Sequence, residues 1–228
     1  MAISNDSRAR IKKAFEPIAL GMGRLGLTPD ALTLIGFGIT VVGAVLIAGQ
    51  LWLAGGVVIF LGGVLDMFDG TLARATGRVS SLGAFMDSVF DRWGEGIVYV
   101  GIAYGSVAGG FGDGAVLAAA ALASAVMVSY TRAKSEGLGF TAGTGMASIG
   151  LAPREVRIVI LSIGLIGTGI LGGFRPICDS GFSPPCSVDG QGGAEILALA
   201  LALIAILATI TTIQRILHVR RQAKQQST

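Results

Sequence analysis

Four aspartates at helical spacing are the residues of this chain best suited to chemistry. Asp66 and Asp69 stand three positions apart, and Asp87 and Asp91 stand four apart, so each pair projects from one face of its helix. No histidine or cysteine lies near them in the sequence. Ligands that are all oxygen suit hard cations such as Mg²⁺ or Mn²⁺, and facing carboxylates repel one another without such a cation. The spacing therefore predicts a divalent-metal site.

The residues around the first pair leave room for a phosphate-bearing ligand. Gly70 and Ala73 are small, and Arg74 comes next in the chain. Small side chains let a nucleotide approach the helix closely, and a guanidinium group offers a fork of donors to phosphate oxygens. Two metal ions here would clamp a diphosphate and orient an incoming hydroxyl for in-line attack, while a neighbouring carboxylate accepts the hydroxyl proton.

The elements that must position these residues are strongly apolar. The chain of 228 residues is 52% hydrophobic and 14% charged, and it contains 36 glycines, a composition typical of a membrane protein. Apolar runs long enough to cross the hydrocarbon core occur at 31–49, 51–72, 83–106, 114–131, 156–174 and 193–214. We therefore predict an all-α membrane protein with six transmembrane helices. The aspartates fall at the end of the second helix and the start of the third, so a helical hairpin brings them together.

Basic residues indicate the orientation of these helices. Lys and Arg in short loops stay on the cytoplasmic side, and here they gather before the first helix, in the loops at 73–82 and 132–155, and in the C-terminal tail. We expect a multi-pass protein of the cell membrane with both termini in the cytoplasm. Ile11, Phe15 and Ile18 recur at helical spacing beside basic residues, which predicts a short N-terminal amphipathic juxtamembrane helix. An ordinary cytoplasmic extension is the alternative.

The expected organisation is one membrane domain with two short flanks. Residues 1–30 form a cytoplasmic segment with the surface helix, 31–218 form the six-helix domain, and 219–228 form a cytoplasmic tail. The net charge of +3 reflects the topology, and with no nucleic-acid motif present we expect no nucleic-acid partner. Cys178 and Cys186 share the loop after the fifth helix, where a disulfide and a loop without chemistry are both open.

Residues 66–91 match the pattern of a known family. The segment reads D-x2-D-G-x2-A-R-x8-G-x3-D-x3-D and resembles the signature of the CDP-alcohol phosphatidyltransferase family at every fixed position. The resemblance implies an integral-membrane enzyme of phospholipid biosynthesis, which transfers a phosphatidyl group from a CDP-linked lipid such as CDP-diacylglycerol to an alcohol and releases CMP. It also implies a homodimer in which each subunit has its own site.

The resemblance further implies roles for single residues. Two Mg²⁺ or Mn²⁺ ions in each active site would be held by Asp66, Asp69, Asp87 and Asp91, and Asp91 would be the catalytic base. Contacts with the CDP-lipid are expected from Asp30, Thr33, Gly70, Ala73, Arg74 and Ser80. The stretch from Asp30 to Thr33 also has the form of an N-terminal helix cap, and one residue can serve both purposes.

The acceptor alcohol is indicated by three further stretches. RLGLTPDALTLIG, SYTRAKSEGLG and TTIQRILHV resemble the phosphatidylinositol phosphate synthase branch, whose acceptor is inositol phosphate and whose acceptor pocket is basic. The matching positions are Arg132, Arg154 and Arg215. In LAPREVR, however, Pro153 and Val156 stand where that branch has acidic residues. Basic residues at cytoplasmic helix ends also follow from topology alone, and the rival acceptors are glycerol 3-phosphate, phosphatidylglycerol and serine.

Two other classes of protein remain open. An ion carrier also places acidic residues within its spans, although nearer the midplane. A membrane scaffold with a structural metal would release no CMP. Among the other polar residues, Glu95 lies one turn beyond Asp91 and has Arg92 as its expected ion-pair partner, and His218 lies among the basic residues of the tail. Neither is assigned a catalytic role.

Overall fold

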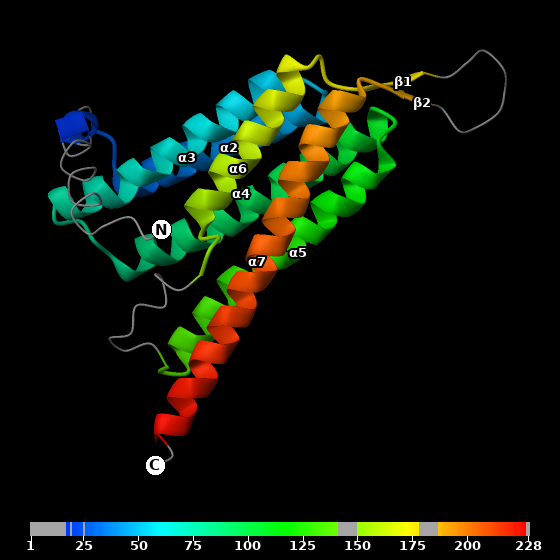
Figure 1. Ribbon diagram of the computed structural model, residues 1–228. Coiled ribbons are helices and arrows are strands. Elements are labelled where there is room, and N and C mark those ends of the chain that lie inside the picture. Colours follow the sequence, from blue (N-terminus) through cyan, green and yellow to red (C-terminus); the bar gives the residue numbers. More distant parts are fainter. Residues whose placement is uncertain (1–16, 19, 25, 141–149, 178–186, 227–228) are drawn as a thin grey trace.

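The chain folds into long helices and one small pair of strands (Figure 1). The computed structural model describes residues 17–18, 20–24, 26–140, 150–177 and 187–226. The helices are α2 (Pro29–Ala48), α3 (Trp52–Ala75), α4 (Ser81–Ala108), α5 (Gly112–Gly137), α6 (Arg154–Ile170) and α7 (Gln191–Gln226). Between α6 and α7, β1 (Arg175–Ile177) pairs antiparallel with β2 (Ser187–Asp189). This strand pair was not predicted from the sequence.

Four helices of the described chain, α2, α3, α5 and α7, are long and apolar enough to cross a membrane. The prediction of a helical membrane protein is confirmed to that extent. The α6 helix has only 17 residues, about 26 Å at the usual helical rise, and α4 contains four charged residues within three consecutive turns, Asp87, Asp91, Arg92 and Glu95. Six transmembrane helices therefore stay a prediction.

Some sequence predictions fall on residues outside the described ranges. Ile11 and Phe15 of the predicted amphipathic helix lie there, although residues 17–18 and 20–24 are helical. Cys178 and Cys186 also lie outside the described residues.

The helices pack so that α3, α4 and α6 meet around one region. The α2 helix packs against both α3 and α4, α6 lies against α3 and α7, and α5 runs between α4 and α7 (Figure 1). Close approach of α2 and α4 depends on glycine, because a Cβ added at Gly101 or Gly105 would lie 2.5 Å from the carbonyl oxygen of Ala44 or Ile47 respectively. Small residues at helix contacts are common in membrane proteins, and here they fix the helix that carries Asp87 and Asp91.

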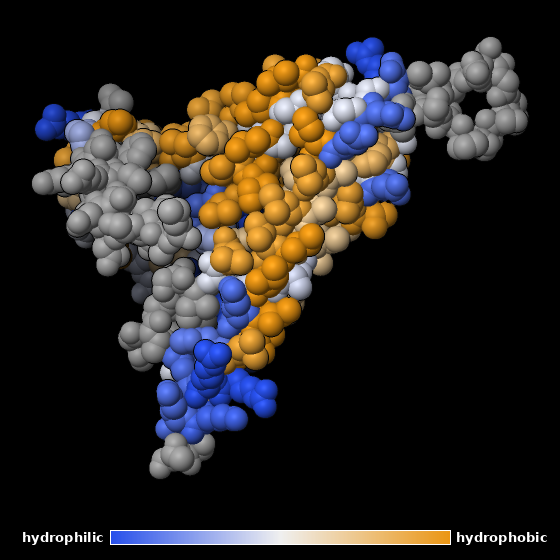
Figure 2. Space-filling view, in the orientation of Figure 1, coloured by the Kyte–Doolittle hydropathy of each residue, from blue (hydrophilic) through white to orange (hydrophobic). Residues whose placement is uncertain are grey.

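The outer surface is apolar over a broad band. Figure 2 shows hydrophobic side chains spread across the helices and hydrophilic ones gathered at two opposite ends, the C-terminal end of α7 and the end near the strand pair. Large apolar residues such as Val100, Ile163 and Leu199 are more than half exposed, which suits contact with lipid. The 36 residues of α7 extend about 54 Å, well beyond the hydrocarbon thickness of about 30 Å, so its basic C-terminal turns project beyond the apolar band.

Candidate active site

The first element of the site is a buried contact between α2 and α3. The hydroxyl of Thr33 donates a hydrogen bond to Oδ2 of Asp69 at 2.8 Å, and the backbone N–H of Gly70 donates to Oδ1 of the same carboxylate. Asp69 is only 6% exposed. Both carboxylate oxygens thus have partners, which is what a buried carboxylate requires, and Asp69 is held in one orientation.

Arg154 joins the carboxylates of two other helices. Arg154 is the first residue of α6. Its Nη2 lies 2.6 Å from Oδ2 of Asp66 on α3, and its Nη1 lies 2.9 Å from Oδ1 of Asp91 on α4. Asp91 is also 3.2 Å from Nη1 of Arg92. One planar guanidinium group therefore spans the two aspartate-bearing helices, a contact for which arginine is better suited than lysine.

The four aspartates form one electrostatic unit. Asp66 and Asp87 interact with each other and with both Asp69 and Asp91. In the part of the chain that the structure describes, no three carboxylate, histidine or cysteine side chains converge closely enough to enclose a metal ion. A cationic guanidinium group is already present among these carboxylates. An all-oxygen donor set that attracts a cation fits Mg²⁺ or Mn²⁺.

The residues predicted to contact a nucleotide lie where α2, α3 and α4 meet. Ser80 caps α4, because its Oγ accepts a hydrogen bond from the N–H of Gly83 at 2.9 Å. A Cβ added at Gly83 would lie 3.1 Å from Oδ1 of Asp30, so the start of α2 reaches the start of α4. Asp30 is exposed there. The missing side chain at Gly83 brings Asp30 and Ser80 together.

The cap of α2 differs from the one that the sequence suggested. Thr28 is the N-cap residue, and its Oγ1 accepts a hydrogen bond from the N–H of Ala31 at 3.2 Å. Asp30 lies in the first turn and Thr33 within the helix. The cap interpretation of these two residues is wrong, because the chain already provides a cap two positions earlier, and their side chains face the α3 and α4 partners described above.

The remaining predicted nucleotide contacts lie at the end of α3. Gly70 leaves space for the Arg74 side chain, since an added Cβ would lie 3.3 Å from Nη1 of Arg74. Nη2 of Arg74 also donates to Oγ1 of Thr71 at 3.4 Å. Arg74 is exposed, while Ala73 beside it is half-buried. The Arg74 guanidinium group therefore folds back along the helix toward Gly70.

The three arginines predicted to bind the acceptor have different surroundings. Arg154 lies among the carboxylates. Arg215, on α7, is 4% exposed and donates to the carbonyl oxygen of Val128 on α5. Arg132 forms an ion pair with Glu136 one turn along α5 at 2.8 Å, and its side chain is 43% exposed. Arg132 and Arg215 also lie within electrostatic range of each other.

The expected pairing of Glu95 with Arg92 is wrong. Arg92 instead contacts Asp91 and donates to the carbonyl oxygen of Ser88 at 3.1 Å. Glu95 receives two hydrogen bonds from Arg157 of α6, both 2.9 Å long. Helical spacing offered a signal for this pair, because Glu95 follows Asp91 by four positions and Arg157 follows Arg154 by three, so both pairs repeat one turn further along the same two helices.

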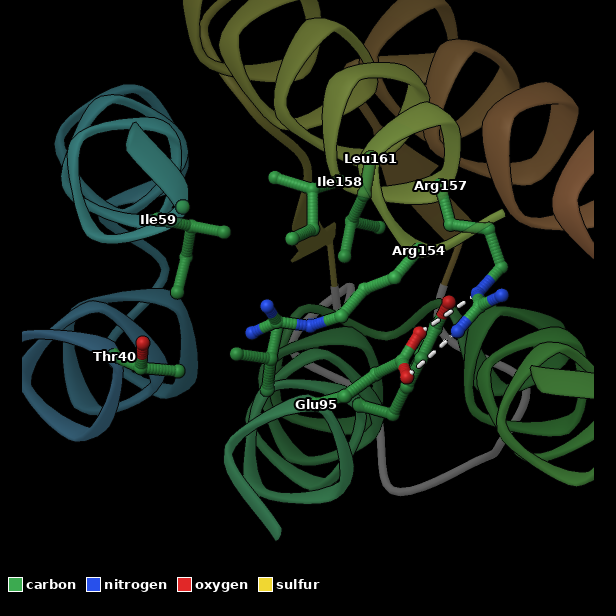
Figure 3. Close-up of a pocket in the computed structure, with 10 residues that line it drawn as sticks. Thr40, Ile59, Glu95, Arg154, Arg157, Ile158 and Leu161 are labelled. Carbon is green, nitrogen blue, oxygen red and sulfur yellow. Dashed lines mark hydrogen bonds and ion pairs between the residues drawn. The ribbon is translucent and has the colours of Figure 1, made fainter. Parts of the chain in front are cut away.

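A small cavity of about 30 Å³ lies beside these two arginines (Figure 3). Its polar lining comes from Thr40, Glu95, Tyr99, Arg154 and Arg157, and the rest is apolar. Within the described residues, Nε of Arg154 and the hydroxyl of Tyr99 are buried without a hydrogen-bond partner. A cavity of this size has room for a water molecule, and these two groups offer it partners, so the interior behind Arg154 combines a mainly apolar lining with a few polar groups.

Comparison with known proteins identifies the family. A family described as CDP-alcohol phosphatidyltransferase matches residues 26–223. The chain is 32% identical over 215 residues to archaetidylinositol phosphate synthase of Pyrococcus horikoshii, covering 94% of this chain and 95% of the relative. It is 34% identical over 225 residues to phosphatidylinositol phosphate synthase of Streptomyces avermitilis, covering 96% and 83%.

A solved structure agrees with this result. The phosphatidylinositol phosphate synthase of Mycobacterium tuberculosis with CDP-DAG bound is 28% identical, with a TM-score of 0.69 over 91% of this chain and 94% of that chain. The same enzyme in complex with manganese and citrate gives a TM-score of 0.70 at 28% identity over 90% and 88%. The chain therefore belongs to the CDP-alcohol phosphatidyltransferase family and is an enzyme of phospholipid biosynthesis.

Proposed function

We propose that this enzyme transfers the phosphatidyl group of CDP-diacylglycerol, or its ether-lipid equivalent, to inositol phosphate and releases CMP. The observation that carries the proposal is the bridge from Arg154 to Asp66 and Asp91. It puts a phosphate-binding side chain directly against the carboxylates of the family motif. The names of the bacterial and archaeal relatives support inositol phosphate as the acceptor and leave both kinds of lipid donor open.

Divalent cations belong to this proposal. Two ions, Mg²⁺ or Mn²⁺, would be held by Asp66, Asp69, Asp87 and Asp91, and the manganese complex of the mycobacterial relative supports a metal here. When bound, such ions neutralise the charge that develops on the departing CMP. The hydrogen bond from Thr33 fixes one ligand, Asp69, before any ion binds, so part of the ligand set is preorganised.

The chain's own residues account for binding and proton transfer. The CDP-lipid would contact Asp30, Thr33, Gly70, Ala73, Arg74 and Ser80, which lie at the meeting point of α2, α3 and α4. The acceptor hydroxyl oxygen forms a bond to the lipid-side phosphorus as the bond from that phosphorus to CMP breaks. Asp91 takes the hydroxyl proton as general base. Movement of Arg154 from Asp91 to the acceptor phosphate would release Oδ1 of Asp91 for this step, while Oδ2 keeps its contact with Arg92.

The acceptor phosphate would be bound by Arg154, Arg132 and Arg215. Arg154 is the member nearest the reacting groups, and the other two come from the facing helices α5 and α7. Opposite charges favour this partner exchange, because a phosphate dianion offers a guanidinium group the same fork of oxygen acceptors as two carboxylates.

The membrane arrangement is also proposed. Six transmembrane helices with both termini in the cytoplasm of the cell would place the carboxylates at the inner edge of the membrane. Acyl chains can then stay in lipid while the nucleotide and the polar acceptor arrive from water. A homodimer with one site in each subunit completes the proposal, and the apolar outer band leaves ample surface for it (Figure 2).

The deciding experiment is CMP release by the purified full-length protein in lipid nanodiscs with Mg²⁺ or Mn²⁺. CDP-diacylglycerol and an ether-lipid donor are each tested with inositol phosphate, inositol, glycerol 3-phosphate, phosphatidylglycerol and serine. We expect release with inositol phosphate that is lost in Asp91→Asn. Release with a different acceptor would keep the transferase and replace the alcohol. No release with any pair of substrates, from folded protein, would favour the ion carrier or the metal-stabilised scaffold.

A further inference from the structure

The pair formed by Glu95 and Arg157 joins α4 to α6 just behind the site. Arg157 is 1% exposed and donates from Nε and Nη2 to the two carboxylate oxygens of Glu95, both at 2.9 Å. Figure 3 shows the two side chains facing each other between the helices. A two-bond arrangement of this kind fixes both distance and angle, so α6 cannot slide or turn against α4 without breaking it.

Arg157 also holds the segment that leads into α6. Its Nη1 donates to the carbonyl oxygen of Ala152 at 2.9 Å. In addition, Oγ1 of Thr211 on α7 accepts hydrogen bonds from the N–H groups of Leu151 and Ala152, both at 3.0 Å. The first turn of α6 has no cap from Pro153, the residue in the N-cap position. Arg157, itself paired with Glu95 of α4, and Thr211 of α7 therefore fix this helix start in place of a local cap.

Arg154 is the first residue after this fixed segment. Its side chain reaches Asp91 on α4, and Arg157 reaches Glu95 one turn further along the same two helices. Of these two contacts, only the one between Arg154 and Asp91 involves a residue of the family motif. A shift of the helix start by a fraction of a turn would move the Arg154 guanidinium group away from Asp66 and Asp91, whereas a rigid start presents it at one place.

We infer that Glu95, Arg157 and Thr211 are positioning residues, which hold the start of α6 so that Arg154 can bind the acceptor phosphate beside the carboxylates. The inference rests on the proposed function, because it takes Arg154 as an acceptor contact. Positioning groups behind a contact residue restrict its geometry, and misplacement of a reacting group by about 1 Å can lower the rate about 100-fold. The effect of these residues is therefore on acceptor binding, with the proposed CDP-lipid site, where the starts of α2 and α4 meet the end of α3, left intact.

The test is steady-state CMP release by the full-length protein in nanodiscs for Glu95→Gln and Thr211→Val, with both substrates varied separately. We expect the KM for inositol phosphate to rise about tenfold, while the KM for the CDP-lipid changes less than about twofold. The matched control is Thr168→Val, since Thr168 is a buried α6 threonine that donates to Gly164 at 2.8 Å and to Gly193 at 3.1 Å, far from Arg154 along the helix. It should lower thermal stability without changing either KM.

A mutant cycle separates positioning from general stabilisation. In an Arg154→Lys background, Glu95→Gln should add little to the acceptor KM, because the guanidinium group that Glu95 helps to position is already absent. Additive effects of the two changes, or an unchanged acceptor KM in Glu95→Gln, would overturn the inference. If the single variant does not fold, Glu95→Met combined with Arg157→Met decides, because replacing both members of a buried pair by apolar residues preserves stability. That double variant should also show the raised acceptor KM, and a wild-type value would overturn the inference.

Failure of the proposed function has a different signature. A wild-type protein that releases no CMP with inositol phosphate refutes that function before any variant is compared. A wild-type protein that is active with inositol phosphate, together with positioning variants of unchanged acceptor KM, refutes only the inference about Glu95, Arg157 and Thr211.

Discussion

Arg154 and Arg157 lie one turn apart on α6 and both contact α4, but they differ in their exposure and in their partners. The side chain of Arg154 is 24% exposed and is shared between Asp66 and Asp91. The side chain of Arg157 is 2% exposed and donates two hydrogen bonds to Glu95 and a third to the carbonyl oxygen of Ala152. A shared, accessible ion pair can exchange a partner for substrate, while a buried two-bond pair is destabilising to break. The difference fits the substrate-binding role proposed for Arg154 and the positioning role inferred for Arg157.

Removal of divalent cations should have the largest effect. Four carboxylates interact at the site, and the guanidinium groups of Arg154 and Arg92 form ion pairs with only two of them, Asp66 and Asp91. These groups leave negative charge over, and a diphosphate adds more. We expect chelation by EDTA to abolish CMP release and added Mg²⁺ or Mn²⁺ to restore it. Thermal melting in EDTA should show folded protein. Full turnover in EDTA would contradict a metal-dependent site.

Replacement of the proposed base should come next. Asp91→Asn removes the group that accepts the hydroxyl proton and one contact of Arg154, and we expect kcat to fall about 1,000-fold. The control is Asp113→Asn, since Asp113 is an exposed residue in the first turn of α5 and should keep wild-type kcat. Equal kcat in the two variants would remove Asp91 from the mechanism.

The comparison between the two arginines can be tested directly. Arg154→Lys loses the planar guanidinium group that spans two helices. We expect the KM for inositol phosphate to rise about 10- to 100-fold, with little change in thermal stability. Arg157→Met leaves Glu95 buried without its partner, and we expect the free energy of unfolding to fall by about 3 kcal/mol. The measurements are acceptor kinetics and thermal melting of both variants. A large loss of stability in Arg154→Lys and none in Arg157→Met would reverse the assignment.

Much of this fold could be predicted because its signal is local. The apolar run at 31–49 became α2, Pro29–Ala48, and the run at 114–131 lies within α5, Gly112–Gly137. Hydropathy depends only on neighbouring residues, so the positions of the helices follow from it. It gave no sign of β1 and β2, which are three residues each.

The parts of the site that depend on the spacing of residues within a helix could be predicted from the sequence. The parts that depend on how the helices pack against one another could not. The motif placed four aspartates on two helices, and the structure brings them into one electrostatic unit. The partner of Glu95 depends on how α6 lies against α4, and the helical spacing of Arg154 and Arg157 indicates this partner only once Arg154 is known to contact Asp91, so proximity in the sequence favours Arg92 instead. The same limit applies to Thr211, whose hydrogen bonds cross 59 and 60 positions of the chain.

The smallest effect should come from Thr33→Val. This change keeps the shape of the side chain but removes the hydroxyl that donates to Asp69 at 2.8 Å, so the carboxylate retains only its bond from Gly70. A hydrogen bond to a charged group contributes about 1.5 kcal/mol or more, which corresponds to about a tenfold loss, and we expect this loss in affinity for Mn²⁺ measured by electron paramagnetic resonance. Thr209→Val is the control, because Thr209 donates to Ala205 within α7, away from the carboxylates. If both variants bind Mn²⁺ equally well, Asp69 is not preorganised by α2, and the fixed part of the site is confined to the contact between α4 and α6.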